Sequence, residues 1–300
     1  MLDPLKELPE QPLTFDINDE NLEIFIHFQN GKYNFIGQKG DTYPQQKPLN
    51  DNAISISMDA QMLLNGISRS LFATADDELR PVMNGVYFDI HTDDLTFVAS
   101  DGHKLVRLRN LAVKSPERAS FILPKKPANL LKNLLAKESE QVLIKFDDNN
   151  AYITCTNFEM VCRLIEGRYP NYNSVIPQEN PFKVTIDRIS FLNALKRVSV
   201  FSNPASSLVK LHLKDSLITV SAQDIDFSTS AEERIVCQFD GTELSIGFKA
   251  TYLIEILGNI SSEEVVLELA DPSRAGLIVP SENDEDEDLL MLLMPMMLND

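Results

Sequence analysis

The sequence predicts an α+β protein in which one unit, a helix followed by antiparallel strands, is used repeatedly. Two observations support this prediction: two helical segments align without a gap at an offset of 128 residues, and hairpin patterns lie between the helices. Such units bury the apolar stripe of each helix on one face of a sheet. With 300 residues, 43% of them apolar, the chain is long enough for two or three domains.

Four segments show the spacing of apolar side chains that is typical of helices. The aligned pair is 58–74 and 186–202, in which Asp59 and Asp187 stand at plausible N-cap positions. In the first of these we assign Met58 to the apolar face of the helix. Two shorter segments, 126–137 and 250–260, lie between and after the aligned pair, so helices recur regularly along the chain.

The segments between the helices alternate between apolar and polar residues, as half-buried strands do. Hairpins with Asp, Asn or Ser turns are predicted at 22–37, 86–100, 142–155, 209–222 and 265–279. Junctions that contain proline lie at 43–52 and 175–182. We therefore expect the end of an incomplete domain at 1–52, a central domain at 53–178 and a C-terminal domain at 179–300.

The net charge of the chain is −18, because 45 acidic residues outnumber 27 basic ones. Taken globally, this balance argues against a nucleic-acid binder. Counted with Lys125 and Lys249 at the starts of the two shorter ones, the four helical segments nevertheless carry +6 together, so the rest of the chain carries −24. A helix face of Arg, Lys, Asn and Ser can bind phosphates without reading bases, although a solvated helix face that binds nothing has the same pattern.

The sequence lacks the signals of several protein classes. No apolar stretch could cross a membrane and no secretory signal is present, so we expect no membrane contact and a cytoplasmic location. Cys155, Cys162 and Cys237 form no close pair and are expected to be buried thiols. The four histidines are scattered and no Walker or dinucleotide loop occurs, so we expect no metal and no cofactor.

Three short motifs stand out: SDGHKL at 100–105, RYPNY at 168–172 and LLMPMML at 292–298. In this order, and with the helix-plus-hairpin repeat, they resemble the bacterial DNA polymerase III β subunit family, the sliding clamps. The resemblance extends from Leu2 to Leu298. It implies the DNA-clamp fold, with helices on the inner face and sheets outside, and a non-catalytic processivity factor that encircles duplex DNA without sequence preference.

The resemblance also implies a peptide-binding pocket between the last two domains. Its partners would be the replicative DNA polymerase, the clamp loader, repair polymerases and mismatch-repair proteins, each through a short peptide with Gln and Leu or Phe. Flexible Met and Leu side chains suit varied peptides. The matching positions are Met83, Ser100, Gly102, His103, Lys104, Leu105, Pro170, Ser174, Val175, Tyr252, Leu292, Leu293, Met294, Pro295 and Met296.

The same resemblance implies a DNA-facing surface and a head-to-tail homodimer. The DNA-facing cations are expected to be Arg69, Arg80, Lys125, Lys126, Lys132, Lys196 and Arg197. Val200 and Phe201 are expected at the dimer seam. Because most of the family's first domain would precede Met1, we expect ring formation by this chain to be impaired.

Two other functions remain open at this point. Asp101 and His103 could serve a hydrolase, although no G-x-S-x-G elbow accompanies them. The chain could also be a protein-interaction scaffold that never contacts DNA, in which case the cations of the helices should scatter outward. The acidic run at 282–288 is expected to be a solvated hairpin loop.

Overall fold

The computed structural model describes residues 2–43 and 48–298 and divides the chain after Pro48 into two compact units. The smaller unit contains helix α1 (Leu2–Lys6), a short 3-10 helix (Gly40–Thr42) and one antiparallel sheet. The sheet has the order β1 (Thr14–Ile17), β2 (Glu23–Phe28), β3 (Gly31–Ile36). The predicted hairpin is thus β2 and β3, and β1 was not predicted. Part of the predicted junction, residues 44–47, lies outside the described residues.

The larger unit consists of four copies of one pattern, a strand, a helix and three further strands. The first copy is β4 (Ile54–Asp59), α2 (Ala60–Ser70), β5 (Gly85–Ile90), β6 (Leu95–Ser100) and β7 (Lys104–Asn110). The second is β8 (Ala119–Pro124), α3 (Lys125–Leu135), β9 (Gln141–Phe146), β10 (Asn150–Thr154) and β11 (Glu159–Arg163).

The third copy is β12 (Phe182–Asp187), α4 (Arg188–Val198), β13 (Leu208–Lys214), β14 (Leu217–Asp224) and β15 (Thr229–Val236). The short β16 (Gln238–Phe239) follows. The fourth is β17 (Leu244–Lys249), α5 (Ala250–Gly258), β18 (Glu264–Leu269), β19 (Gly276–Pro280) and β20 (Glu287–Leu293). All four predicted helices and all five predicted hairpins are present, which confirms the α+β prediction.

An aspartate defines where each of the two longest predicted helical segments begins. Asp59 accepts hydrogen bonds from the backbone N–H groups of Gln61 (2.8 Å) and Met62 (3.3 Å), and Asp187 accepts one from that of Ser190 (2.7 Å). These bonds satisfy donors that the first helical turn leaves free. The assignment of Met58 to the helix was wrong, because the chain before the cap is extended and Met58 is a buried residue of β4.

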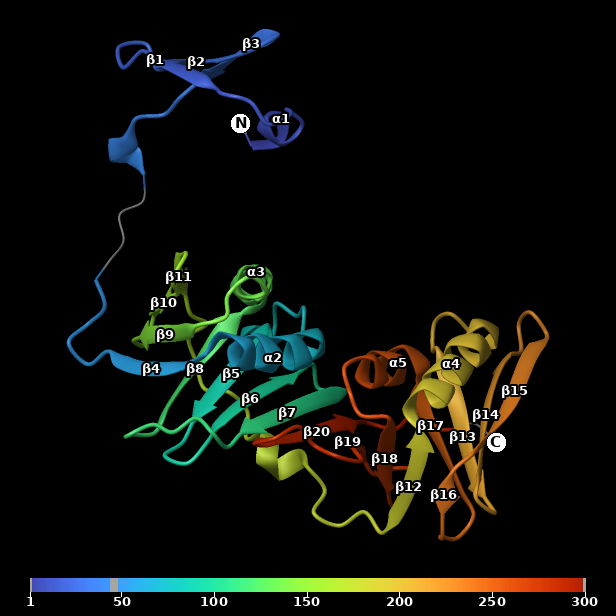
Figure 1. Ribbon diagram of the computed structural model, residues 1–300. Coiled ribbons are helices and arrows are strands. Elements are labelled where there is room, and N and C mark those ends of the chain that lie inside the picture. The colour runs from blue at the N-terminus through green and yellow to red at the C-terminus, as the bar shows by residue number, and fades with distance from the viewer. Residues whose placement is uncertain (1, 44–47, 299–300) are drawn as a thin grey trace. The chain divides into compact units, whose positions relative to one another are not determined.

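The four helices of the larger unit lie in a row on one side of its strands (Figure 1). Each turns an apolar face toward the sheets: the fully buried residues include Leu63 and Ile67 of α2, Leu131 of α3, Leu195 of α4 and Ile256 of α5. Helix α2 packs against α3, and α4 packs against α5. None of the helices in the described ranges is long and apolar enough to cross a membrane.

The cysteines agree largely with the prediction of buried thiols. Cys162 and Cys237 are buried, whereas Cys155 is half-buried. Burial raises the pKa of both Cys155 and Cys162 to about 11. At neutral pH these two thiols are therefore protonated and poor nucleophiles.

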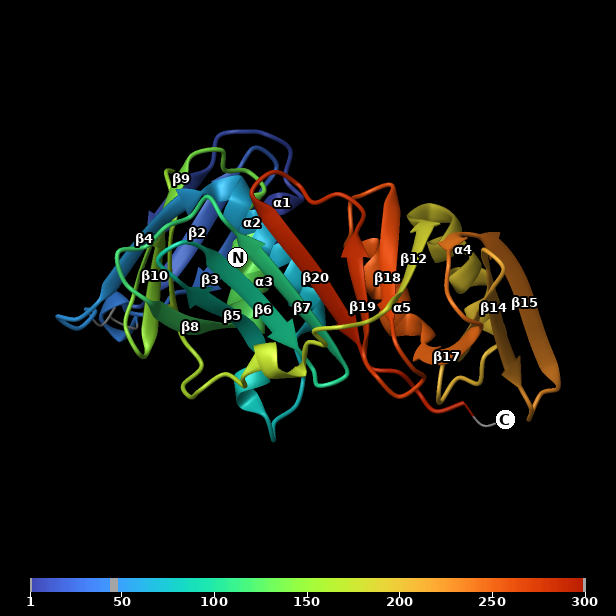
Figure 2. The ribbon, with the colours of Figure 1, turned by 90° about the horizontal axis from the view of Figure 1, so that it is seen from below.

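A nine-stranded sheet with the order β16-β12-β18-β19-β20-β7-β6-β5-β8 runs through the whole larger unit. Its central pairing joins β20 antiparallel to β7, from Glu287 opposite Asn110 to Leu293 opposite Lys104. Figure 2 shows the two strands side by side. The predicted central and C-terminal domains therefore share one sheet.

Ion pairs hold the start of β20 from both faces of this sheet. On the helix side, Glu287 accepts hydrogen bonds from Asn65 Nδ2 (2.6 Å) and Arg69 Nη1 (3.2 Å) of α2. On the opposite side, Asp288 pairs with Arg107 (2.8 Å) and Arg109 (3.5 Å) of β7. The acidic run separates two strands and residues 282–286 are exposed, as predicted, but Glu287 and Asp288 at its end belong to β20 and bind arginines across the domain junction.

Truncation of Met291 tests the contribution of the β20 core. Met291 is fully buried, whereas Met297 in the following tail is 79% exposed. We expect Met291→Ala to lower the free energy of unfolding by about 2–5 kcal/mol, since it leaves a cavity. Met297→Ala, the matched control, should change it by less than about 0.5 kcal/mol. Urea unfolding followed by circular dichroism measures both, and equal values would contradict the assignment of β20 as core.

Candidate functional site

The turn at 100–105, between β6 and β7, is held by its own aspartate. Asp101 Oδ1 accepts hydrogen bonds from the backbone N–H groups of His103 (2.8 Å) and Lys104 (2.9 Å), and Asp101 Oδ2 contacts Lys104 Nζ (3.0 Å). Gly102 has a φ of +90°, which a residue with a side chain rarely adopts. The motif SDGHKL is thus first of all a rigid turn that presents the exposed His103.

The charges and hydrogen bonds around Asp101 lower its pKa, so it is poorly suited to act as a base. Burial alone raises the pKa of Asp101, but the N–H groups of residues 103 and 104 and the Lys104 ammonium outweigh burial and lower the pKa below its usual value. The carboxylate binds the backbone N–H of His103, and no hydrogen bond joins it to the imidazole. The arrangement that the hydrolase hypothesis needs is therefore not formed.

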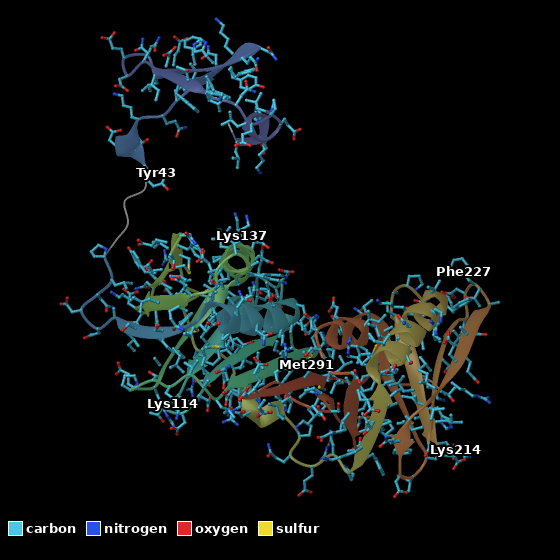
Figure 3. All side chains as sticks on the ribbon, viewed as in Figure 1. Tyr43, Lys114, Lys137, Lys214, Phe227 and Met291 are labelled. Atoms are coloured by element: carbon cyan, nitrogen blue, oxygen red, sulfur yellow. The ribbon has the colours of Figure 1, made fainter. Side chains whose placement is uncertain are left out.

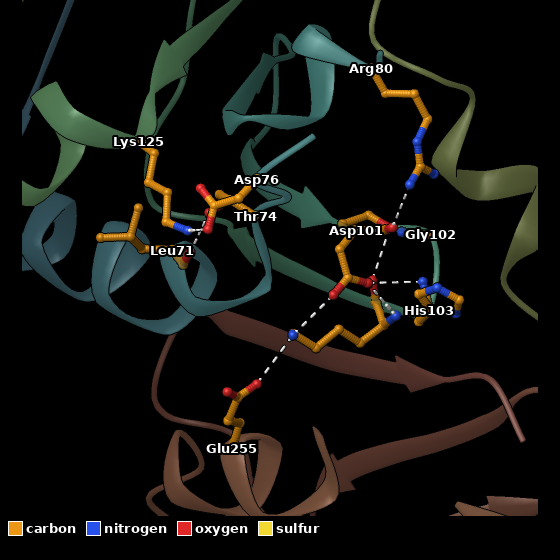
Figure 4. A network of polar contacts seen from close by, with 11 residues as sticks. Leu71, Thr74, Asp76, Arg80, Asp101, Gly102, His103, Lys125 and Glu255 are labelled. Atoms are coloured by element: carbon orange, nitrogen blue, oxygen red, sulfur yellow. Dashed lines mark hydrogen bonds and ion pairs between the residues drawn. The ribbon is translucent and has the colours of Figure 1, made fainter. Parts of the chain in front are cut away.

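Lys104 connects the turn to helix α5 (Figure 4). Its side chain is 6% exposed, and its Nζ lies 3.1 Å from Glu255 Oε2 as well as 3.0 Å from Asp101 Oδ2. The same Nζ lies 4.0 Å from the ring centroid of Tyr252, and Lys249 Nζ lies 4.7 Å from that centroid. Cations over an aromatic face are attracted to it, so Tyr252 is held by two lysines.

The C-terminal tail runs past this turn. The Met294 N–H donates to His103 O, and the Met296 N–H donates to Gly247 O, both at 2.8 Å. A side chain at Gly247 would meet Met296 O at 2.7 Å, so the close approach of the tail requires glycine there. The side chains of Tyr252, Met294, Pro295 and Met296 are at least partly exposed beside His103 or on the tail.

The loop that contains Tyr169 and Tyr172 covers the sheet face opposite the helices. The rings of Tyr169 and Tyr87 stack with centroids 4.6 Å apart, and Tyr172 Oη donates to Asp89 Oδ2 (2.8 Å). These rings and Ile176 pack with Leu105 and Leu292 in one apolar cluster. Pro170, Ser174 and Val175 are exposed on the outside of the loop.

The structure divides the predicted peptide-site residues into exposed and buried ones. Those buried are Met83, Ser100, Lys104, Leu105, Leu292 and Leu293. Leu105 and Leu292 support the loop from beneath, whereas Leu293 faces the helix side of the sheet and is directed away from the site. We did not predict Asp101, Lys249 or Glu255 as part of the site, although Lys249, Tyr252 and Glu255 follow one another at the i, i+3 spacing of one helix face.

Four of the seven predicted DNA-facing cations are bound to carboxylates. Arg69 contacts Asp284 and Glu287 and its side chain is only 13% exposed. Arg80 pairs with Asp77 (2.8 Å) and donates to Asp101 O, and Lys125 pairs with Asp76 (Figure 4). Arg197 makes two hydrogen bonds, of 2.8 and 2.6 Å, to Glu233 of β15.

The other three predicted DNA-facing cations could bind a phosphate without first leaving a carboxylate. Lys126 and Lys196 are exposed and Lys132 is half-exposed, and within residues 2–43 and 48–298 none of them makes an ion pair. Exposed ion pairs contribute about 0–1 kcal/mol, so a phosphate can also draw Lys125 and Arg197 from their partners. Arg69 differs, because its partner Glu287 is itself buried.

Val200 and Phe201 lie in a 3-10 turn after α4 and are 78% and 40% exposed. Near them, β15 is the last strand of the sheet β15-β14-β13-β17, so its outer edge is free to pair. Ile225 and Phe227, in the turn before β15, are also exposed. Figure 3 shows Phe227 at the outer end of this sheet. Exposed apolar side chains beside an open strand edge are typical of an interface.

The chain is similar to known proteins over nearly all its length. The family model for the DNA polymerase III beta subunit, central domain, matches residues 57–171, and that for its C-terminal domain matches 173–297. The beta sliding clamp of Pseudomonas aeruginosa is 27% identical over 299 residues, which cover 99% of this chain and 80% of that protein. The beta sliding clamp of Staphylococcus aureus is 27% identical over 293 residues, with 97% and 77% covered.

Solved structures agree with these matches. The sliding clamp (DNA polymerase III subunit beta) of Pseudomonas aeruginosa bound to griselimycin superposes with a TM-score of 0.91 at 26% identity, covering 99% of this chain and 79% of that one. The DNA polymerase III beta subunit of Thermotoga maritima has a TM-score of 0.89 at 24% identity, with 99% and 79% covered, and shares the fold.

The lowered pKa of Asp101 predicts a pH-dependent contribution to stability. A carboxylate whose pKa is depressed in the folded state stabilises that state above its unfolded pKa, near 3.8, and loses this effect as the pH falls through the folded value. We expect Asp101→Asn to lower the free energy of unfolding most at pH 7, and the difference from wild type to shrink as the pH falls below about 4.

Urea unfolding at several pH values between 7 and 3.5 measures this difference. Asp148→Asn, in an exposed turn, is the control and should show little difference at any pH. A difference for Asp101→Asn that does not change with pH would contradict the assigned role of its charge.

Proposed function

Because the chain belongs to the DNA polymerase III beta subunit family, we propose that it acts as a DNA sliding clamp that tethers its partners to duplex DNA. Members of this family are non-catalytic processivity factors. A clamp needs a surface that binds the DNA backbone without reading bases, a site for partner proteins and a contact that closes the ring.

The arrangement of the helices is the observation that carries the proposal. All four lie on one side of the strands, and three of the expected DNA-facing cations, Lys126, Lys132 and Lys196, belong to two of them and make no ion pair among the described residues. Phosphate contacts by flexible lysines do not depend on sequence, so the protein can slide. The acidic remainder of the chain repels DNA from other surfaces.

Replacement of Lys132 tests this surface. We expect Lys132→Gln to weaken binding to duplex DNA and to reduce the slope of log affinity against log salt by about 1, because one phosphate contact is lost. The matched control is Lys114→Gln, since Lys114 is exposed and lies away from the helices (Figure 3). Fluorescence anisotropy between 50 and 200 mM salt measures both, and equal behaviour of the two variants would remove the support for DNA binding by the helices.

We place the site for partner proteins between the turn at 100–105, the loop at 168–176 and the tail after β20, and call it the peptide site. The residues open to a ligand are Gly102, His103, Pro170, Ser174, Val175, Tyr252, Met294, Pro295 and Met296. Of the other predicted residues, Leu105 and Leu292 support them from below. Apolar and aromatic groups around a few polar ones suit a short peptide with Gln and Leu or Phe. The partners would be the replicative polymerase, the clamp loader, repair polymerases and mismatch-repair proteins, in the cytoplasm.

Ring closure would use Val200, Phe201 and the edge of β15 against a second copy of the chain. Aspartate in the interface would bury an unpaired charge. We expect the double variant Val200→Asp, Phe201→Asp to need at least a tenfold higher protein concentration before half of it self-associates. This corresponds to a loss of about 1.4 kcal/mol in the free energy of association. Leu79→Asp, at a fully exposed loop position, should leave it unchanged. Sedimentation velocity over a concentration series measures the self-association of both variants. Identical profiles for the two would exclude Val200 and Phe201 from the interface.

A further inference from the structure

We propose that Lys104 is a positioning residue that holds the two walls of the peptide site together and does not itself contact the peptide. The inference rests on the proposed function, because it concerns the same site. It departs from what the family resemblance alone implied, namely that Lys104 belongs to the surface that receives the peptide.

The contacts of Lys104 use its whole ammonium group. Two carboxylates bind it, Asp101 of the turn at 3.0 Å and Glu255 of α5 at 3.1 Å, and the ring of Tyr252 lies 4.0 Å away. An ammonium has three N–H donors. Two carboxylates and one ring therefore occupy it, and with 6% of its side chain exposed it offers a ligand neither a donor nor much surface.

The environment of Lys104 favours its protonated, positively charged form. Burial alone would lower the pKa of Lys104, but Asp101 and Glu255 together raise it above the usual value. The lysine is thus charged at neutral pH, where it can bind both carboxylates. Removing one partner of such a buried group leaves the others uncompensated, which is costly.

The geometry of the exposed site depends on this contact. Lys104 and Lys249 both contact the ring of Tyr252, whose centroid is 6.3 Å from that of His103, with 27° between the planes. His103 belongs to the turn and also binds the tail through Met294 N. If Lys104 no longer holds α5, Tyr252 is free to shift relative to His103 and Met294, and a peptide meets a site of different shape. Misplacement of this kind lowers affinity without the loss of any direct contact.

A double-mutant cycle separates positioning from direct contact. The variants are Lys104→Met, Glu255→Gln and both together, and the probe is a fluorescent synthetic peptide that contains Gln, Leu and Phe. We expect Lys104→Met to weaken binding about tenfold, Glu255→Gln about threefold, and the double variant no more than Lys104→Met, because both act through one contact. Lys104→Arg, which keeps the charge, should restore binding to within about threefold of wild type.

A second Lys–Glu ion pair, in which the lysine is exposed, provides a control for position in the fold. Lys183 Nζ of β12 lies 3.0 Å from Glu268 Oε1 of β18, outside the peptide site. Lys183→Met and Glu268→Gln should leave peptide affinity unchanged. If Lys104 instead contacts the peptide, Glu255→Gln frees the ammonium group, and the peptide should bind this variant more tightly than wild type, which would overturn the positioning role.

The fluorescence emission of a tryptophan at position 252 distinguishes a local displacement in the folded protein from a general loss of stability. The chain contains no tryptophan, so Tyr252→Trp introduces a single reporter in contact with both lysines. In that background, Lys104→Met should shift the emission of the folded protein, whereas Lys183→Met should not.

Each outcome either supports or overturns the positioning role of Lys104. Wild-type affinity in Lys104→Met or Glu255→Gln, or additive losses in the double variant, overturns the positioning role while the proposed function stands. A wild-type chain that does not bind the peptide overturns the proposed function, and the inference with it. If Lys104→Met does not fold, Glu255→Gln decides alone, since the Glu255 side chain is 46% exposed and its loss is mild.

Discussion

The pairing of β20 with β7 is the contact on which the rest of the structure depends. It joins two copies of the repeated pattern that are far apart in the sequence into one nine-stranded sheet. Backbone hydrogen bonds can form in more than one register, so the side chains of β20 must determine which register is adopted. Leu289, Met291 and Leu293 face the helix side and Leu290 and Leu292 the other, and a slip by one residue would exchange the two sets. Glu287 and Asp288 then bind arginines on opposite faces at one end of the strand.

This one register determines both functional surfaces. It aligns the helices of the two halves on the same side of the strands (Figure 1). At the other end of β20, where Leu293 lies opposite Lys104, it brings the tail to His103 and α5 to the turn at 100–105. The proposed DNA surface and the proposed peptide site are therefore not independent features, because both depend on the same strand pairing.

Local patterns in the sequence predicted the local parts of this structure. Apolar periodicity located the four helices, the caps at Asp59 and Asp187 located two helix starts, and alternation located five hairpins. Long-range pairing was not predictable in this way: Arg69 lies 215 residues from Asp284, and counting charges element by element treats both as free. The same limit applies to the peptide site, where the motif identified His103 but could not reveal that Lys104, beside it in sequence, is directed into the junction with Glu255.

A buried ion pair at such a junction requires an explanation, because taking charges out of water costs more than a well-packed apolar contact of the same size. An apolar contact between α5 and the turn would tolerate sliding, whereas an ammonium between two carboxylates and an aromatic face has one good arrangement. Conformational specificity is thus the advantage that offsets the desolvation cost at Lys104. The position of Tyr252 opposite His103 follows from it, and that position gives the exposed part of the site a defined shape before any ligand arrives.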